Sequence, residues 1–558
     1  MKNIAANLKA YARFYTGLRG FLCQKVSVAE AETIVRQRIA QRDTNFMRLM
    51  ERGIFGYRSS PYLPLLKLAG CELGDIRNRV ETRGLEATLR ELREAGVYVT
   101  FEEFKGRKPI VRNGKVFHVE PRQFDNPYLS RHYDSTTGGT TGSGIRVRVD
   151  LDHLAADAPH MGLVYHIHGV LNTPMAIWFG TLPDPTGTIA TLMRSRCGSV
   201  PLKWFSPVMM QDSKPLFKYR LTTQFTVMAG RLFGVPIPRP QPVRLNQAAI
   251  VARWLAKTAS AQGAALLVTH VSQAMRVCMA AMDEELDLTH VTIMAGGEPP
   301  SPAKIRVIKR TGARWVPLYF FTEAGAVGLG CAHPVDETDV HFLKDALALI
   351  QYPRQVPGAE TTVKAFNYTS LLPAAPKLLL NVESDDYGII ETRSCGCPFE
   401  AHGYTEHLRE IRSFRKLTGE GVTLIGSDML YILEEELPAR FGGSPLDYQL
   451  LEEEDQQGFT RLSLLVHPKI QITDESQIIA TVLDALRRRG AGPQAIGLWK
   501  QAETLRIKRK EPISTGRGKF MPLHRIKSSQ EVTNDAPSEK RRSLIGDLMS
   551  KTKYTSKK

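Results

Sequence analysis

A run of small and hydroxyl-bearing residues stands out at 134–149, which reads DSTTGGTTGSGIRVRV. Small residues let a backbone curl around an anion with its N–H groups pointing inward, and hydroxyl groups add donors without bulk. The run is therefore a candidate phosphate-binding loop, and a flexible linker is the alternative interpretation. Its candidate nucleotide-binding positions are Thr137, Gly138, Gly139, Thr140, Thr141 and Gly142.

Two common nucleotide-binding loops are excluded by the spacing of this run. A Walker loop needs a Lys-Ser or Lys-Thr pair after its glycines, and none follows here. The dinucleotide fingerprint fails because Val147 stands where a third glycine is required after Gly142 and Gly144. What remains is a Ser/Thr-Gly loop that leads into a strand at 145–149.

A second glycine-containing segment, 294–300, reads MAGGEPP and follows an apolar run typical of a strand. Gly296 and Gly297 allow a flat ring to approach the backbone closely. Together with Glu298 they are candidate nucleotide-binding residues. A plain strand–turn–helix unit is the alternative.

About twenty residues later, 318–325 reads LYFFTEAG. Tyr319 can stack on an aromatic base. Thr322 and Glu323 place a hydroxyl and a carboxylate at a strand end, where Mg²⁺ bound to phosphate oxygens would need an oxygen ligand. The alternative is a threonine that caps an ordinary helix.

Two further segments hold charged groups suited to a nucleotide. Residues 381–387 read NVESDDY, in which Asp385 or Asp386 suits a bidentate grip on ribose hydroxyls, although an acidic pair in a loop is often only solvated. Residues 513–519 read ISTGRGK. Lys519, on a glycine loop, can reach a carboxylate and an α-phosphate and stabilise the charge of a transition state, with a basic surface loop as the alternative.

Two short pairs of soft ligands, Cys331 with His333 and Cys395 with Cys397, can chelate a metal. Three thiolates and one imidazole suit a structural zinc site, and free thiols in neighbouring loops are the alternative. Seven scattered cysteines, an odd number in a large chain, argue against a disulfide framework. A reducing cytoplasm is the simplest interpretation.

The composition is that of a soluble globular enzyme with room for two or more domains, since 42% of the 558 residues are hydrophobic and 23% charged. No apolar run is long enough to predict a membrane span. The net charge of +17 suits anionic ligands such as a nucleotide, CoA or an acidic carrier protein. The basic C-terminal tail can attract nucleic acid or an anionic membrane, but no nucleic-acid fold signature accompanies it, and we favour a solvated tail.

The pattern of elements predicts an α/β fold. Residues 1–130 are mostly helical, with runs at 28–42 and 84–95, whereas short apolar strands and helices alternate from 134 onward. We expect a helical N-terminal part at 1–130, an α/β core at 131–413, a small α+β domain at 414–527 and a disordered tail at 528–558. Expected core elements are 264–269, 272–282, 291–295, 302–310 and 316–321, and expected elements of the small domain are 422–425, 459–467, 477–489 and 504–508.

In their order along the chain, these motifs resemble those of adenylate-forming enzymes, which join a carboxylic acid to AMP and pass the acyl group to a thiol or an amine. The phosphate loop of that family reads S-G-T-T-G, and 138–142 matches it with one change. Its G-x-E-P pattern corresponds to 296–299, and its Y-G-x-T-E pattern to 319–323 with Phe320 in place of the glycine.

The resemblance implies a role for each residue of the second pattern. Tyr319 would contact adenine, Thr322 the α-phosphate and Glu323 the Mg²⁺.

The resemblance also assigns the charged residues further along the chain. Asp386, with Asp385 close behind, and Arg412 would bind the ribose. Lys519 would be the lysine that promotes adenylation. The family's hinge aspartate is missing, because a phenylalanine and an arginine occupy 414–415.

Three features resemble the phenylacetate–CoA ligase subgroup: a helical N-terminal region with Asn126-Pro-Tyr128, Ile145 where other members end the loop in lysine, and the C-x-C pair. The resemblance implies ATP, Mg²⁺ and CoA or a carrier-protein phosphopantetheine as cofactors, a small carboxylic acid as substrate, a mobile C-terminal domain and a dimer as one oligomeric state. An amide-forming ligase and a catalytically degenerate nucleotide-binding member are the alternatives.

Overall fold

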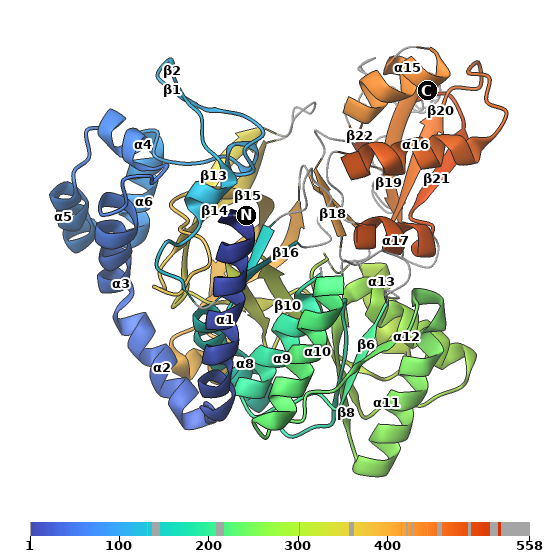
Figure 1. Cartoon of the computed structure of the whole chain (residues 1–558), viewed down its shortest axis with the longest axis horizontal. Helices are drawn as coiled ribbons and strands as arrows, with labels where there is room; N and C mark the ends of the chain where they lie inside the picture. Colours follow the sequence, from blue (N-terminus) through green and yellow to red (C-terminus); the bar gives the residue numbers. More distant parts are fainter. Residues whose placement is uncertain are drawn as a thin grey trace, which may run out of the picture.

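The computed structural model describes residues 2–130, 132–136, 146–182, 184–207, 217–298, 300, 302–355, 362–413, 416–419, 422–425, 429, 431–443, 445–454, 460–488, 493–513 and 523–525. A helical N-terminal region flanks a large sheet with its helices, and a smaller sheet with its own helices lies beside them (Figure 1). The α/β fold predicted from the sequence is confirmed.

The N-terminal region is helical because apolar residues recur at helical spacing and capping groups mark the helix starts. Ser27 and Glu30 form a capping box at the start of the second helix. A hairpin and a short 3-10 helix at Pro121–Phe124 follow. The helices are α1 (Lys2–Cys23), α2 (Val28–Ala40), α3 (Arg42–Leu49) continued by a π-helix (Met50–Phe55), α4 (Leu63–Leu68), α5 (Leu73–Arg83), α6 (Leu85–Glu94) and α7 (Phe101–Phe104), and the hairpin strands are β1 (Ile110–Arg112) and β2 (Lys115–Phe117).

The first half of the large sheet is parallel, with strand order β10-β9-β8-β5-β6-β7. Its central strands are apolar runs because helices cover both faces, and Trp178 and Trp204 are fully buried. The strands are β5 (Met175–Trp178), β6 (Lys203–Ser206), β7 (Pro240–Pro242), β8 (Ala265–His270), β9 (Val291–Gly296) and β10 (Arg314–Phe321). The helices are α8 (Leu151–Ile167), α9 (Thr186–Arg196), α10 (Phe217–Leu232), α11 (Ala248–Gln262), α12 (Val271–Asp283) and α13 (Pro302–Arg310).

The second half of the sheet is antiparallel and continues in the order β10-β11-β12-β16-β15-β14-β13. It curls back on itself, because the rings of Phe321 on β10 and Tyr368 on β14 lie 5.0 Å apart although other strands separate the two in the order. Its strands are β11 (Gly325–Gly330), β12 (Val340–Phe342), β13 (Leu347–Gln355), β14 (Thr362–Ser370), β15 (Val382–Thr392) and β16 (Glu406–Ser413), and a separate hairpin joins β3 (His132–Thr136) to β4 (Arg146–Asp150).

The C-terminal unit is built on a four-stranded sheet in the order β21-β20-β19-β22. Its helix α17 approaches the large sheet's helices, where the Leu245 backbone N–H donates to Gln501 Oε1 at 3.5 Å. The domain boundaries predicted from the sequence stay a prediction. The unit contains the hairpin β17 (Lys416–Gly419) and β18 (Val422–Ile425), a π-helix (Ile432–Glu436), α15 (Leu437–Phe441), β19 (Tyr448–Glu454), β20 (Thr460–Val466), α16 (Glu475–Arg488), α17 (Pro493–Ala502), β21 (Leu505–Arg509) and β22 (Leu523–Arg525).

Over the part of the chain that the structure describes, no helix combines the length and apolar character needed to cross a membrane.

Candidate active site

The carboxyl ends of the parallel strands form the natural place for a ligand in this fold. Strand order reverses between β5 and β8, and ligands of open α/β sheets bind at such a switch point. His270 ends β8 and Phe179 follows β5, and their rings meet edge to face with centroids 5.0 Å apart. These two rings therefore form one wall at the switch point.

The two glycines after β9 are required by close packing. A Cβ on Gly296 would lie 2.1 Å from the carbonyl oxygen of Leu318 on β10. Gly297 has φ +79°, and a Cβ there would lie 2.6 Å from Nδ1 of His270. The end of β9 thus packs directly onto β10 and onto the His270 ring, which leaves no room for side chains.

Glu298 is buried, and its carboxylate is held by neighbours within the protein. Ser272 Oγ donates to it at 2.5 Å, and the Lys304 ammonium lies 3.6 Å away. These contacts tie the loop after β9 to the start of α12. Glu298 therefore fixes the shape of the loop that follows β9.

Tyr319 and Asp386, predicted from separate motifs, meet in the structure. The Tyr319 hydroxyl donates to Asp386 Oδ2 at 2.8 Å, and Ser413 Oγ donates to the other carboxylate oxygen. The Tyr368 hydroxyl in turn donates to that of Tyr319 at 3.2 Å. Burial and the nearby Asp386 carboxylate raise the pKa of Tyr319 well above its usual value, so this phenol stays protonated and donates.

The other two predicted ribose-binding residues differ in exposure. Arg412 lies opposite Tyr387 in the pairing of β15 with β16, and its side chain is exposed. Asp385 is fully buried and adopts a left-handed backbone with φ 65°, which is uncommon outside glycine. Of the two neighbouring aspartates, Asp386 and not Asp385 accepts the hydrogen bond from the Tyr319 hydroxyl.

Glu323 lies in the turn after β10, beside the exposed Thr322. Its buried carboxylate forms an ion pair with Lys105, which follows α7. No motif singles out Lys105 in the sequence, because its partner lies 218 residues away. A hydroxyl and a carboxylate at this turn suit Mg²⁺, but a cation bound there would have to compete with the Lys105 ammonium.

Seven predicted site residues lie outside the described residues, so the structure does not place them. These are Thr137, Gly138, Gly139, Thr140, Thr141 and Gly142 of the predicted phosphate loop, and Lys519.

A cluster of soft ligands lies where β12 meets the loop before β16. One ligand atom each from Cys331, His341, Cys395 and Cys397 lies within 4.8 Å of the other three. The imidazole of this cluster is that of His341, and the prediction of His333 is corrected here. His333 is exposed, and its Nδ1 lies 3.2 Å from the carbonyl oxygen of Cys395.

The surroundings of the cluster suit a metal ion. His341 Nδ1 lies 2.8 Å from the Tyr404 carbonyl oxygen, which holds the proton on Nδ1 and leaves Nε2 for a metal. Backbone N–H groups of Ala332 and His333 donate to the sulfurs of Cys397 and Cys331 at 3.4 and 3.3 Å. The hydrogen bond between these two sulfurs lowers the pKa of the Cys397 thiol. Three sulfurs and one imidazole fit tetrahedral zinc.

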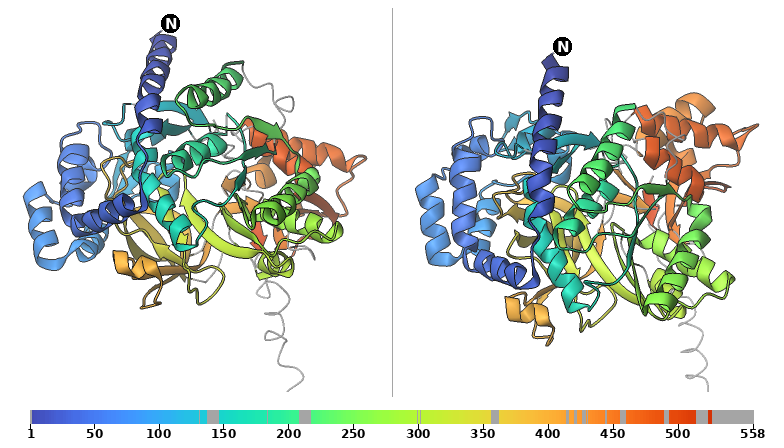
Figure 2. Two further views of the ribbon diagram at one scale, coloured as in Figure 1. Left: turned by 90° about the horizontal axis from the view of Figure 1, so that it is seen from below. Right: turned by 60° about the horizontal axis from the view of Figure 1, so that its bottom comes forward.

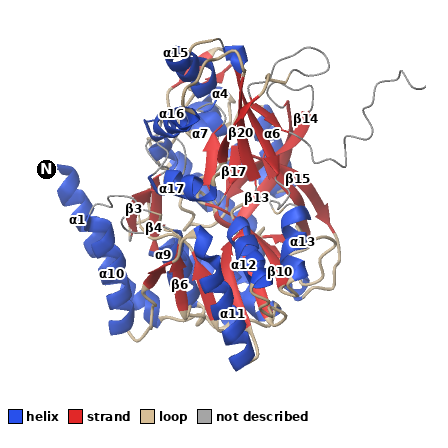
Figure 3. Ribbon diagram, turned by 90° about the vertical axis from the view of Figure 1, so that its right-hand side faces the viewer, coloured by secondary structure: helices blue, strands red, loops and turns tan. Residues whose placement is uncertain are grey.

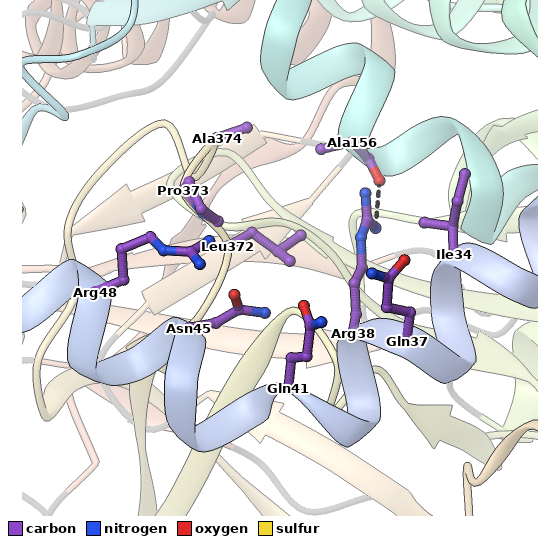
Figure 4. Close-up of a pocket in the computed structure, with 10 residues that line it drawn as sticks. All are labelled: Ile34, Gln37, Arg38, Gln41, Asn45, Arg48, Ala156, Leu372, Pro373 and Ala374. Carbon is purple, nitrogen blue, oxygen red and sulfur yellow. Dashed lines mark hydrogen bonds between the residues drawn. The ribbon is translucent and has the colours of Figure 1, made fainter.

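A cavity of about 270 Å³ opens on the N-terminal helices (Figure 4). Arg38 donates to the Ala156 carbonyl oxygen at 2.8 Å across one side of it. None of the described residues predicted to bind nucleotide or metal lines this cavity. Its lining residues are Ile34, Gln37, Arg38, Gln41, Asn45, Arg48, Ala156, Leu372, Pro373 and Ala374.

Comparisons with known proteins identify the fold. The sequence matches no protein-family model and no curated protein. The crystal structure of 2-hydroxyisobutyryl-CoA ligase, in complex with 2-HIB-AMP and CoA in the thioesterification state, matches with a TM-score of 0.50. The two chains are 14% identical, and the match covers 94% of this chain and 93% of that chain. This chain has the fold of that CoA ligase.

A second solved structure, an amide bond synthetase from Marinactinospora thermotolerans, is 11% identical with a TM-score of 0.37. That match covers 86% of this chain and 92% of the synthetase. The fold assignment rests on the CoA ligase alone.

Proposed function

We propose that this protein is an ATP-dependent acid ligase of the adenylate-forming superfamily. It would activate a carboxylic acid as acyl-AMP and transfer the acyl group to a thiol. The observation that carries the proposal is the hydrogen bond between Tyr319 and Asp386, because it brings the motif proposed for adenine and the motif proposed for ribose to one place. The shared fold with a CoA ligase supports the same conclusion.

In the first half-reaction, a carboxylate oxygen of the acid attacks the α-phosphorus of ATP, and pyrophosphate leaves. Asp386 and Arg412 would hold the ribose, and Tyr319 would lie against adenine. Thr322 would contact the α-phosphate, where negative charge builds up in the transition state. We assign Lys519 to the same charge.

The glycine-rich loop at 137–142 would wrap the phosphates of ATP with its N–H and hydroxyl groups. Mg²⁺, when bound, would neutralise charge on the triphosphate, and Glu323 would be its protein ligand. Glu323 can reach a cation only if the Lys105 ammonium yields its place.

The acid would lie against the wall formed by His270 and Phe179, at the switch point of the sheet. An edge-to-face pair offers apolar ring surface and a polar edge, which suits an aromatic or medium-length acid. The carboxylate of such an acid would point toward the ends of β9 and β10.

For the second half-reaction we propose a thiol acceptor, CoA or the phosphopantetheine of a carrier protein, in the manner of a phenylacetate–CoA ligase. The net charge of +17 supports an anionic acceptor. We also propose a structural zinc ion at Cys331, His341, Cys395 and Cys397, and a cytoplasmic location.

The experiment that tests the function is a product analysis. The protein is incubated with ATP, Mg²⁺ and a panel of aromatic and medium-chain acids, with CoA or an amine present, and the products are identified by mass spectrometry. Acyl-CoA supports the proposal. An amide as the sole product would mean that the acceptor is an amine and not a thiol. If no acid in the panel leads to AMP formation, the proposal is contradicted.

One observation favours a second candidate, a nucleotide-binding protein without catalysis. The Lys105 ammonium already occupies the carboxylate of Glu323, the group proposed to bind Mg²⁺. A protein of this kind would bind ATP but release no pyrophosphate with any acid.

A further inference from the structure

Helix α10 turns large apolar side chains toward solvent. Leu221, Phe225, Met228 and Leu232 are exposed to 38, 47, 59 and 80%. At about 100° per residue, these four positions fall within roughly 60° of one another around the helix, so they form one stripe. We call these four residues the α10 stripe.

The inward face of α10 is buried and mixed in character, because it carries the core residue Val227 together with three threonines. Thr222, Thr223 and Thr226 are each at most 7% exposed. The Tyr15 hydroxyl of α1 donates to the Thr222 carbonyl oxygen at 3.1 Å. The helix is thus held with its threonines and Val227 inward, while the four larger apolar residues of the stripe stay in solvent, where an ordinary surface helix carries polar side chains.

Basic residues flank the α10 stripe. Arg220 and Arg231 are exposed along one side of it on α10, and Arg13 and Arg19 are exposed on the neighbouring α1. Neither helix contains an aspartate or a glutamate. The apolar stripe therefore lies on a pair of helices whose charged residues are all basic.

The two helices lie side by side at one edge of the molecule (Figures 2 and 3). A flat surface can therefore approach both of them at once.

A second copy of this chain is a poor occupant of the stripe. A twofold interface places the same patch on both partners, so the arginines of one copy would face those of the other. The occupant must instead combine negative charge with apolar surface.

We propose that the α10 stripe and the arginines of α1 and α10 bind the surface of an anionic phospholipid membrane. A helix with Leu, Phe and Met on one face and arginines beside them lies in the plane of a membrane interface, with its apolar side chains among the upper acyl chains. Each basic residue near an anionic leaflet contributes favourably. The cytoplasmic leaflet is anionic, which agrees with the proposed location.

The basic C-terminal tail, which we expect to be solvated, can supply a second electrostatic signal without folding. Stable membrane attachment generally needs two signals, such as an inserted apolar group and a polybasic segment. The last residues of the chain include Lys540, Arg541, Arg542, Lys551, Lys553, Lys557 and Lys558.

The test is co-sedimentation of the full chain with vesicles of phosphatidylcholine alone or of phosphatidylcholine with phosphatidylglycerol. The stripe variant carries Phe225→Gln, Met228→Gln and Leu232→Gln. The control variant carries Leu202→Gln and Val116→Gln, which replace exposed apolar residues outside the stripe. All three positions changed in the stripe variant are solvent-exposed, and thermal melting checks that both variants fold.

We expect wild type and control to bind the anionic vesicles and not the neutral ones. The stripe variant should bind at least about tenfold more weakly, because three inserted side chains are lost. Raising the salt from about 0.1 M to about 1 M should weaken wild-type binding, since the screening length falls from about 10 Å to about 3 Å.

Two results would overturn the proposal. One is equal vesicle binding by wild type and the stripe variant. The other is a wild type that does not bind the anionic vesicles. That result overturns the proposal even if the stripe mediates self-association in sedimentation velocity or captures an acidic protein. Neither result bears on acid activation, which the product analysis tests separately.

Discussion

The Tyr319 hydroxyl on β10 donates a 2.8 Å hydrogen bond to the carboxylate of Asp386 on β15. The two strands are not neighbours in the sheet, so the contact forms only because the antiparallel half curls back. Ser413 holds the second carboxylate oxygen of Asp386. The carboxylate is therefore fixed in orientation before any ribose arrives.

Replacing Asp386 by Asn should weaken ATP binding by about 10- to 100-fold, because hydrogen bonds to a charged group contribute about 1.5–3 kcal/mol. Isothermal titration with ATP and with AMP measures the change, which should be equal for the two nucleotides if the ribose is the contact. Tyr319→Phe keeps the ring and removes only the hydroxyl, so it should lose less. Unchanged affinity in Asp386→Asn would remove this residue from the site.

The ion pair between Lys105 and Glu323 should make the Mg²⁺ dependence adjustable. Lys105→Met removes the competing ammonium, and we expect Mg²⁺·ATP to raise its melting temperature at lower Mg²⁺ concentration than in wild type. Glu323→Gln should abolish the Mg²⁺ dependence and keep binding of metal-free ATP. An identical Mg²⁺ response in Lys105→Met and wild type would mean that Glu323 is not the metal ligand.

Purified protein kept away from chelators should contain about one zinc ion per chain by elemental analysis. His341→Ala should lower the zinc content and the melting temperature, because it removes one of four ligands. His333→Ala should leave both unchanged, since this side chain is exposed and outside the cluster. The site is disproved if wild type contains no metal, and the ligand assignment is wrong if the two variants behave in the opposite way.

The buried Asp345 should be a large contributor to stability. Its carboxylate accepts from His160 at 2.8 Å and from the Tyr404 hydroxyl at 2.8 Å, and all three side chains are fully buried. Asp345→Asn removes the negative charge that faces both His160 Nε2 and the Arg38 guanidinium, and it should cost about 3–5 kcal/mol. The exposed Asp484, paired with Arg487, provides the control, and Asp484→Asn should cost less than about 1 kcal/mol.

The buried pair of Asp345 and His160 also predicts how stability depends on pH. Burial opposes ionisation of Asp345, but the interactions with His160, Arg38 and Tyr404 together outweigh it, and the pKa of Asp345 lies below its usual value. Its stabilisation is therefore present above the unfolded pKa of about 3.9 and is lost as the pH falls through the lower folded pKa. The melting-temperature gap between wild type and Asp345→Asn should narrow below about pH 4. A gap that widens in acid would contradict the assignment.

The sequence predicts the helices and strands of the fold well, because hydrophobic periodicity and the residues that form caps and turns are local properties of the chain. The helix expected at 28–42 is observed as α2, and the strand and helix expected at 264–269 and 272–282 are observed as β8 and α12. The curl that brings β10 to β14 and β15 is not local. Only the structure reveals it.

The residues of the candidate site differ in the same respect: those in local motifs could be predicted, and those brought in by long-range contacts could not. Tyr319 and Asp386 belong to motifs with fixed local spacing, so both could be named from the sequence. Lys105 follows a short helix far from Glu323 in the chain, and no pattern marks it. His341 lies within β12, ten residues after Cys331, whereas His333 offers the shorter and misleading C-x-H spacing.

The central claim is acid activation through an acyl-adenylate, and acid-dependent exchange of labelled pyrophosphate into ATP tests it most directly. We predict exchange with at least one acid, a fall of about 100- to 1,000-fold in Lys519→Ala, and no change in Lys508→Ala, whose exposed ammonium pairs with Glu453. ATP binding without exchange for any acid, or full exchange in Lys519→Ala, would contradict the account.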